Sequence, residues 1–365
     1  MIRLKNILFF ILMAGICMSC FVSCSSINLK PDYTDLFDHY DDPETYFFSS
    51  VSGNDIIQVM RMIEENIVPI NATDPYGQTA VILAAQKGHL GMVEYLIQQK
   101  ADLNIMDENG STALMVAIQS GCMELAILLV NQGAGINTKD LSGNFPLQIA
   151  IINNETEFVI ILLERGAALD IHDGDGNSPL MTAIRYGNKV IANHLLSRKC
   201  NLRVANIAGE TALHLALQYN NDEIARLLIE HGADLNQQDG SGTTPLMLAV
   251  DYYSIEMIKR MLDNGADPDI RNHLGETALI KAFMNGYMEI IPILLQKKPN
   301  LDIRDNQGFT ILMRAAYDGY IDIVKSLVQN GADQTIRSLE GKTALDMARE
   351  RRYEDIVEFL KKAAR

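Results

Sequence analysis

The amino-acid sequence predicts an all-α solenoid of stacked helical repeats, because two residue types recur with an uninterrupted period of 33 residues. The glycine column is Gly77, Gly110, Gly143, Gly176, Gly209, Gly242, Gly275, Gly308 and Gly341. The alanine column is Ala84, Ala117, Ala150, Ala183, Ala216, Ala249, Ala282, Ala315 and Ala348. A third observation is that apolar residues in each repeat follow the i, i+3, i+4 spacing of a helix face turned toward a core. Such repeats bury their apolar faces by stacking on their neighbours.

Each repeat begins with a turn and continues into a short first helix. The turn reads Asp-x-x-Gly in most repeats, where Asp bonds its own backbone and Gly supplies a positive φ. A Thr or Ser that can cap the helix follows the glycine in eight repeats, whereas Phe145 stands there in the third. The helix is expected to end near a glycine or asparagine, such as Gly88 or Asn154. Tyr253 and Arg352 occupy that place in two repeats, so the sequence does not predict the geometry of the turn there.

The second helix of each repeat is predicted to be amphipathic. In the first repeat its inward-facing residues are Val93, Leu96 and Ile97, and the pair at Leu96 and Ile97 recurs at the same period. In the seventh repeat Pro292 falls inside this helix, where a proline removes a hydrogen bond at about 3 kcal/mol. We therefore expect a kink there.

The fifth repeat, Asn206 to Gln238, carries the most complete motif. Its elements are the turn residues Asn206 and Gly209, then Thr211-Ala212-Leu213-His214, Leu227-Leu228 and Gly232-Ala233-Asp234. This order resembles the ankyrin repeat, in which Thr-Pro-Leu-His is common at the start of the first helix. The resemblance covers roughly residues 46–365 and implies a helix-turn-helix plus a β-hairpin finger in each repeat. It also implies structural hydrogen bonds for His214, and partner binding at the finger tips and the exposed end of the first helix.

The repeat register predicts the domain organisation. The solenoid is expected to span residues 46–365, with an N-terminal cap at 46–73. The nine repeats are expected to start at residues 74, 107, 140, 173, 206, 239, 272, 305 and 338. Within the cap, a degenerate helix and finger is expected to turn Ile56, Val59, Met60 and Ile63 inward. A charged helix from Tyr353 to Ala364 matches the polar outer face that a C-terminal cap requires.

Residues 1–23 have the features of a secretory signal peptide, with Arg3 and Lys5 before an apolar run at 7–16. The following Val22-Ser23-Cys24 resembles a bacterial lipobox, so Cys24 is the predicted lipidation site and Cys20 is a second candidate. An ordinary cleaved signal and an uncleaved anchor are the alternatives. Residues 24–45 are interpreted as an acidic tether. The resemblance implies a secreted lipoprotein of the bacterial cell envelope, on the periplasmic or surface face of the outer membrane.

The remaining cysteines are not expected to form a disulfide. Cys122 and Cys200 lie in the second and fourth repeats, whereas the Cα atoms of a disulfide lie within about 7 Å. Cys200 stands at the alanine place of the Gly-Ala-Asp motif and is expected to be a small buried core residue.

The charge of the chain limits the kinds of partner. It has 46 acidic and 31 basic residues and a net charge of −15. Nucleic acids require a basic stripe, so they are disfavoured as partners. Solubility and basic or neutral protein partners are favoured.

The sequence carries no pattern of residues that predicts catalysis, a cofactor or a metal. Residues 173–177 imitate the start of an EF-hand loop, but Ser178 replaces its invariant glycine and Ile184 its bidentate glutamate. The seven histidines lack metal-binding spacing, and no phosphate-binding loop or nucleophile elbow occurs. A uniform solenoid offers a groove rather than the convergent pocket of an enzyme. We therefore expect a non-enzymatic binding protein that is monomeric.

Two residue columns are candidate partner contacts. The first contains Tyr186, Tyr219 and Tyr252 near the ends of three consecutive first helices, with Arg185 beside it. The second contains Arg271, Arg304 and Arg337, just before the turns of three consecutive fingers. Each column spans roughly 20 Å, given about 10 Å between packed helices. Tyr and Arg are enriched in binding hot spots, although drift in a recently duplicated array gives the same spacing.

These observations predict a lipid-anchored protein-interaction scaffold of the bacterial envelope. The alternative is a structural or protective envelope component, or an accessory factor to an envelope enzyme, without catalysis of its own.

Overall fold

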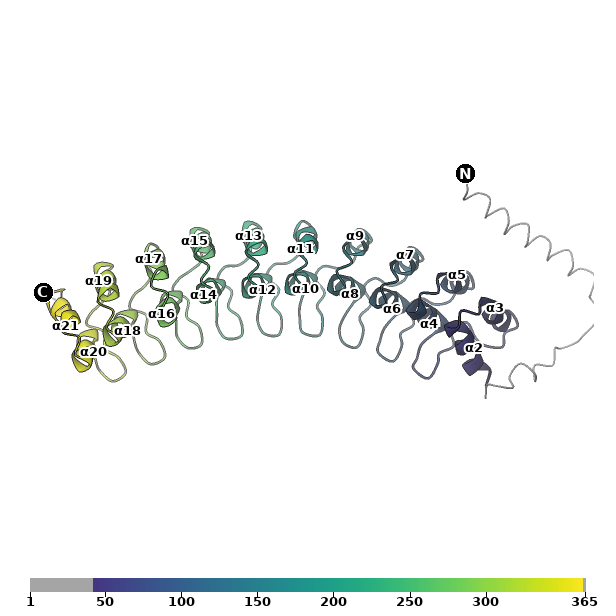
Figure 1. The fold of residues 1–365 in the computed structure, drawn as a ribbon, viewed down its shortest axis with the longest axis horizontal. Helices are drawn as coiled ribbons and strands as arrows, with labels where there is room; N and C mark the ends of the chain where they lie inside the picture. Colours follow the sequence, from purple (N-terminus) through teal and green to yellow (C-terminus); the bar gives the residue numbers. More distant parts are fainter. Residues whose placement is uncertain (1–41, 364–365) are drawn as a thin grey trace, which may run out of the picture.

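The computed structural model describes residues 42–363, and residues 1–41 and 364–365 lie outside this part. The described residues form 20 helices in sequential pairs. Figure 1 shows these pairs stacked side by side along an arc, in the order of the chain. The all-α solenoid predicted from the 33-residue period is therefore confirmed.

One helix pair precedes the nine repeats and consists of α2 (Pro43–Ser52) and α3 (Ile56–Glu64). The first helices of the repeats are α4 (Ala80–Lys87), α6 (Ala113–Gln119), α8 (Pro146–Ile152), α10 (Pro179–Arg185), α12 (Ala212–Gln218), α14 (Pro245–Asp251), α16 (Ala278–Met284), α18 (Ile311–Asp318) and α20 (Ala344–Arg351). The second helices are α5 (Leu90–Gln98), α7 (Met123–Asn131), α9 (Thr156–Glu164), α11 (Lys189–Leu196), α13 (Asp222–Glu230), α15 (Ile255–Asp263), α17 (Ile290–Leu295), α19 (Ile321–Gln329) and α21 (Glu354–Ala363).

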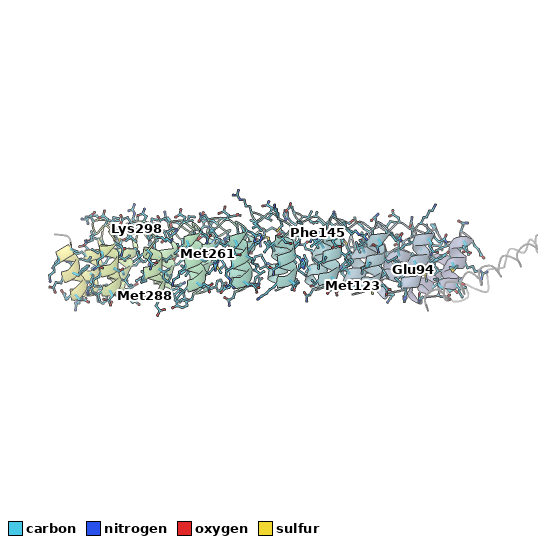
Figure 2. All side chains as sticks on the ribbon, turned by 90° about the horizontal axis from the view of Figure 1, so that it is seen from above. Glu94, Met123, Phe145, Met261, Met288 and Lys298 are labelled. Carbon is cyan, nitrogen blue, oxygen red and sulfur yellow. The ribbon has the colours of Figure 1, made fainter. Side chains whose placement is uncertain are left out.

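The two helices of each repeat lie on opposite sides of the arc. In Figure 1 the first helices and the finger loops line the concave side, and the second helices form the convex side. Seen from above in Figure 2, Met123 and Met288 mark one long edge, and Phe145 and Lys298 mark the other. Met123 begins α7 and Met288 lies just before α17, so the first helices end and the second helices begin along that edge.

The helix starts agree with the capping pattern of the sequence. Thr79 accepts a hydrogen bond from the backbone N–H of Ile82 at 3.3 Å, and the equivalent Thr or Ser caps seven more first helices. Phe145 makes no side-chain cap, but Pro146 occupies the first helical position, where its missing N–H needs no partner.

The first helices end in left-handed residues, as expected for glycine and asparagine at these places. Tyr253 and Arg352 adopt the same conformation, with φ angles of 55° and 61°. The turn therefore keeps one geometry in every repeat. A non-glycine residue there carries a strain of about 1–2 kcal/mol.

Pro292 lies in the first turn of α17, and the expected kink inside the helix is wrong. The register of α15 predicts a helix start at residue 288, but α17 begins at Ile290 and has six residues. Pro292 is then the third helical residue, where the backbone has no intrahelical hydrogen bond to lose. The sequence accommodates the proline by shortening the helix.

The core is continuous from repeat to repeat. All nine alanines of the alanine column are fully buried, which allows neighbouring first helices to approach closely. At the N-terminal end, α2 begins at Pro43 with Asp42 as its cap, so the folded part starts before the expected boundary at residue 46. In α3 the fully buried residues are Val59 and Met62. The expected inward residues Ile56, Met60 and Ile63 are half-buried, because the core covers only one side of this helix.

The finger turns are closed by their aspartates. In the fourth repeat Asp173 Oδ1 accepts hydrogen bonds from the N–H groups of Asp175 at 3.0 Å and Asn177 at 2.7 Å. The segment that imitates an EF-hand is thus an ordinary repeat turn. Among residues 42–363, the expected β-hairpins are reduced to isolated bridges at Thr73–Thr79 and Ala205–Thr211.

The two described cysteines, Cys122 and Cys200, are free thiols. Both are half-buried, so the expectation of a fully buried Cys200 is wrong. Burial nevertheless raises the pKa of the Cys200 thiol to about 11. No helix within the described part is both long enough and apolar enough to cross a bilayer.

Candidate binding surface on the concave side

The three tyrosines of the first column lie at equivalent places on neighbouring inner helices. Tyr186, Tyr219 and Tyr252 are the residues that directly follow α10, α12 and α14, and their backbones cap these helices. Their exposed fractions are 52%, 49% and 48%. Each ring therefore has a buried part that fixes it and an exposed part that is available for contact.

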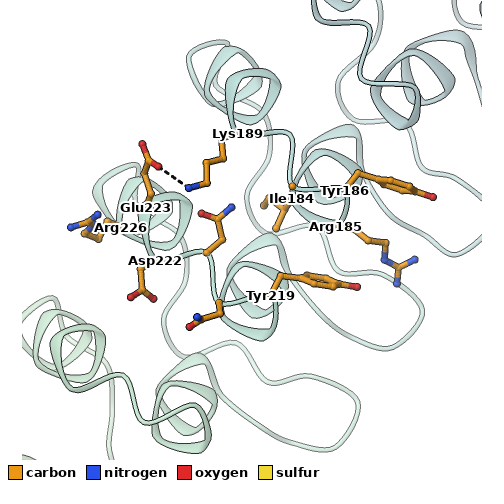
Figure 3. Close-up of a pocket in the computed structure, with 11 residues that line it drawn as sticks. Ile184, Arg185, Tyr186, Lys189, Tyr219, Asp222, Glu223 and Arg226 are labelled. Carbon is orange, nitrogen blue, oxygen red and sulfur yellow. Dashed lines mark hydrogen bonds and ion pairs between the residues drawn. The ribbon is translucent and has the colours of Figure 1, made fainter. Parts of the chain in front are cut away.

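Tyr186 and Tyr219 line a shallow depression of about 650 Å³ between the fourth and fifth repeats. Figure 3 shows the two rings pointing in the same direction, with Arg185 between them. The Arg185 guanidinium lies 3.8 Å from the Asp175 carboxylate at the tip of the finger of its own repeat. Arg185 therefore sits beside the tyrosines, as its place in the sequence predicts.

The sequence analysis missed the charged side of this depression. Lys189 Nζ lies 3.1 Å from Glu223 Oε2 and joins α11 to α13, on the side away from the tyrosine rings (Figure 3). Asp222 lines the same side. The sequence contained a sign of this ion pair. Lys189 and Glu223 have opposite charges and lie 34 residues apart, which places them at nearly equivalent positions of neighbouring repeats.

The third tyrosine has an aromatic neighbourhood of its own. Tyr253, next to Tyr252, makes an edge-on contact with Tyr287, with ring centroids 4.9 Å apart. Its hydroxyl donates a hydrogen bond of 2.7 Å to Glu289 Oε2. This bond is the main reason why the pKa of Tyr253 is raised from its ordinary value.

The arginine column is exposed, but its side chains are bonded to the fingers. Arg271 Nε donates to the Gly275 carbonyl at 3.2 Å, and Arg337 Nη1 donates to the Gly341 carbonyl at 2.7 Å. Arg304 Nη1 lies 3.5 Å from the carbonyl of Arg337 in the next finger.

Gln238, one repeat before Arg271, makes the same kind of contact. Its amide donates to the Gly242 carbonyl at 2.6 Å and to the Arg271 carbonyl at 2.8 Å. A side chain donor in this column thus closes its own finger or ties it to the next one. Arg271 and Arg337 therefore have a structural role within their fingers.

The family model described as "Ankyrin repeats (3 copies)" matches residues 47–140, 133–206, 191–272 and 246–338. These overlapping matches cover well over half of the chain. The chain belongs to the ankyrin-repeat family. Ankyrin repeats generally mediate protein–protein interactions, and ankyrin-repeat proteins are typically non-catalytic scaffolds. No curated protein matches the chain.

His214 occupies the histidine place of the ankyrin motif and is fully buried. Its Nδ1 accepts a hydrogen bond from the Thr211 N–H at 3.2 Å, so Nε2 carries the proton and donates to the Thr243 carbonyl at 3.1 Å. Burial lowers the pKa of His214 below its ordinary value. The lowered pKa favours the neutral form of the histidine, and its hydrogen bond to Thr243 links the fifth ankyrin repeat to the sixth.

The described residues hold no group of three or more His, Cys, Asp or Glu side chains that could bind a metal ion. The tyrosine column on the concave side is the candidate binding surface of this ankyrin array.

Proposed function

We propose that this ankyrin-repeat chain is a protein-binding scaffold that receives one partner across the concave side of its fourth to sixth repeats. The observation that supports this most is the alignment of Tyr186, Tyr219 and Tyr252 at three consecutive helix ends, each about half exposed. Tyrosine is among the residues most enriched in binding hot spots. It offers a large contact area with little conformational entropy to lose.

We further propose that the scaffold is lipid-anchored in the bacterial cell envelope through Cys24. Residues 1–41 lie outside the described part, so this proposal rests on the sequence alone, where Cys24 follows Val22 and Ser23 after an apolar run. The partner is a protein, with the membrane contacted only through the N-terminal lipid. Nucleic-acid binding, catalysis and self-association are not part of the proposed function.

Affinity capture from native membranes with the full chain tests the binding surface. Each tyrosine truncation at a hot spot weakens binding by about 2 kcal/mol, or roughly thirtyfold. The double variant Tyr186→Ala with Tyr219→Ala should therefore lose the captured partner. Its thermal stability should change by less than about 0.5 kcal/mol per site, because exposed positions contribute little to stability.

Tyr76→Ala is the matched control, because Tyr76 is an exposed tyrosine at the finger tip of the first repeat. This variant should capture the partner as wild type does. If the double variant and Tyr76→Ala retain equal amounts of every captured protein, the tyrosine column is not a binding surface. A structural or protective role in the envelope then becomes the better account.

A further inference from the structure

A second hollow lies on the concave side near the C-terminal end of the array, between the eighth and ninth repeats. Its volume is about 500 Å³, within the range of about 300–1,000 Å³ that is common for ligand sites. Residues of α18, α20 and the two adjoining fingers line it, together with the last residue of α16. It shares no residue with the tyrosine depression between the fourth and fifth repeats.

The floor of this hollow contains methionines, and its accessible apolar surface includes Met284, Phe309 and Tyr317 among polar side chains. Met313 and Met347 are almost fully buried beneath it, and Phe309 is half-buried. Met284 and Tyr317 leave about half of their surface exposed at its edge. Methionine side chains are flexible and polarisable, so they adapt to apolar groups of different shapes.

Arg314 forms a fixed wall of the hollow. Its Nε donates to Asp305 Oδ2 at 2.7 Å, and its Nη2 donates to Gln307 Oε1 at 3.3 Å. The guanidinium also lies over the Phe309 ring, 5.5 Å from the centroid. Because Asp305 is buried and matches its charge, Arg314 does not attract an anion into the hollow.

The rim carries an excess of negative charge. Lys342 Nζ lies 2.9 Å from Glu350 and 3.0 Å from Glu340, so one cation is shared by two carboxylates. The Glu350 and Glu340 hydrogen bonds raise the pKa of Lys342 and keep it charged. The exposed Asp318 carboxylate makes no hydrogen bond or ion pair with another residue of the described part.

We propose that this hollow binds a polypeptide segment in which a large apolar side chain is followed by Lys or Arg. The apolar side chain packs against Met284, Phe309 and Tyr317, above the buried Met313 and Met347, and the cationic group pairs with Asp318 at the rim. The net charge of −15 favours the approach of such a segment over an acidic one. This contact is independent of the tyrosine column, so either site can fail without the other.

An acidic segment is the competing occupant. Arg351 lies over the Tyr317 ring, 4.7 Å from the centroid, and places a cation close to one side of the hollow. A basic residue in the bound segment should improve binding if the proposal is right, and an acidic residue should improve it if the competing occupant is right. The experiment compares segments of both kinds.

The test is a titration of the full chain, labelled with ¹³C at its methionine methyl groups, with three synthetic peptides. Each peptide has twelve residues of Gly and Ser around a central pair, which is Phe-Lys, Phe-Glu or Ala-Lys. The Phe-Lys peptide should shift the methyl signals of Met284, Met313 and Met347 and leave that of Met123 unchanged. The Phe-Glu peptide should bind about three- to tenfold more weakly, and the Ala-Lys peptide about thirtyfold more weakly.

Two charge variants assign the contact to Asp318. Asp318→Asn should bring the affinities for the Phe-Lys and Phe-Glu peptides to within about twofold of each other, because the rim carboxylate is lost. Asp222→Asn changes the net charge of the chain equally but lies in the tyrosine depression, and it should leave both affinities unchanged. Both positions are exposed, so both variants should fold as wild type.

Four results would overturn the proposal. They are no shift at the three methionines with the Phe-Lys peptide, tighter binding of the Phe-Glu peptide, binding of the Ala-Lys peptide as tight as that of the Phe-Lys peptide, and an unchanged charge preference in Asp318→Asn. The proposed function has its own readout, since Tyr186→Ala with Tyr219→Ala should leave the methionine titration as it is in wild type.

Discussion

At the residue scale, His214 joins two repeats through a proton that it carries only on Nε2. Its Nδ1 is occupied as an acceptor, and its Nε2 donates to Thr243 in the next repeat. A second proton on this ring would face the Thr211 N–H and would be buried. The lowered pKa of His214 follows from this burial.

Acid should therefore destabilise the chain through His214. Since its pKa is lowered in the folded state, the unfolded state binds the proton more tightly, and stability falls as the pH drops below about 6.5. His214→Gln should remove this part of the pH dependence. At pH 8 it should lie within about 1 kcal/mol of wild type, because Gln148 at the equivalent place donates to the Asn177 carbonyl at 3.0 Å.

Urea unfolding at pH 8 and pH 5 measures this effect. The exposed His231 provides a control, and His231→Gln should keep the acid sensitivity of wild type. An equal loss of stability in His214→Gln and wild type between the two pH values would contradict the account.

The sequence predicted the local roles of residues better than their partners. The Thr caps, the left-handed asparagines and His214 depend on a few neighbouring residues, so their roles follow from spacing. The arginines depend on the path of the finger, which brings the Gly275 carbonyl to Arg271 and the Gly341 carbonyl to Arg337. The spacing of the arginines in the sequence did not show that their N–H groups already donate hydrogen bonds within the fingers.

At the element scale, each finger is a loop that its own side chains must hold in shape. Arg271→Ala removes the bond to Gly275 and the contact of Nη2 with Asn306 at 3.2 Å, so it should lower the free energy of unfolding by about 1 kcal/mol. Arg271→Gln should recover most of this loss, because Gln238 makes the corresponding bond with its shorter amide. Thermal or urea unfolding of the two variants measures the difference.

Arg304→Ala is the control for this prediction, because the one side-chain hydrogen bond that Arg304 makes within residues 42–363 is 3.5 Å long and contributes little. Loss of stability in Arg304→Ala equal to that in Arg271→Ala would show that the finger bonds are not the cause.

We expect the seventh repeat to be the weakest part of the array. Its second helix, α17, has six residues where the neighbouring α15 and α19 have nine each. In a linear array, stability is a sum of repeat and interface contributions, so a short helix weakens its own repeat. Hydrogen exchange should show residues 287–300 opening before residues 206–235. Equal protection of the two segments would refute this.

The position of Pro292 was visible in the sequence, but its effect was not. Repeat register predicted a helix of constant length and therefore a kink. The chain instead delays the helix start to Ile290, which places the proline where no hydrogen bond is lost. The start of α2 was also missed. Residues 24–45 were interpreted as a tether because of their acidic composition, although Asp42 caps a helix that begins at Pro43.

At the scale of the whole molecule, the architecture follows from the period. One glycine column and one alanine column defined nine repeats, because every repeat must stack on a like neighbour to bury its core. The hollow between the eighth and ninth repeats was not predictable in this way. Its residues come from three repeats and from different columns, and one wall is Arg314, which bonds to Asp305 and lies over the Phe309 ring.

The proposed anchor makes a prediction about the full chain in bacteria. Labelled fatty acid should enter the wild-type chain and Cys20→Ser, but it should not enter Cys24→Ser. Stable attachment to membranes needs more than one acyl chain, so Cys24→Ser should appear in the soluble fraction. Persistent labelling of Cys24→Ser would move the site to Cys20 or remove the proposed lipid.

The most direct test of the central claim is photocrosslinking in native membranes from two positions of the full chain. One crosslinkable amino acid replaces Tyr219, which directly follows α12 of the concave side, and the other replaces the exposed Glu157 on α9 of the convex side. The account predicts one dominant crosslinked protein from position 219 and none from position 157. Crosslinks from position 157 alone, or equal crosslinks from both positions, would contradict a partner held on the concave side.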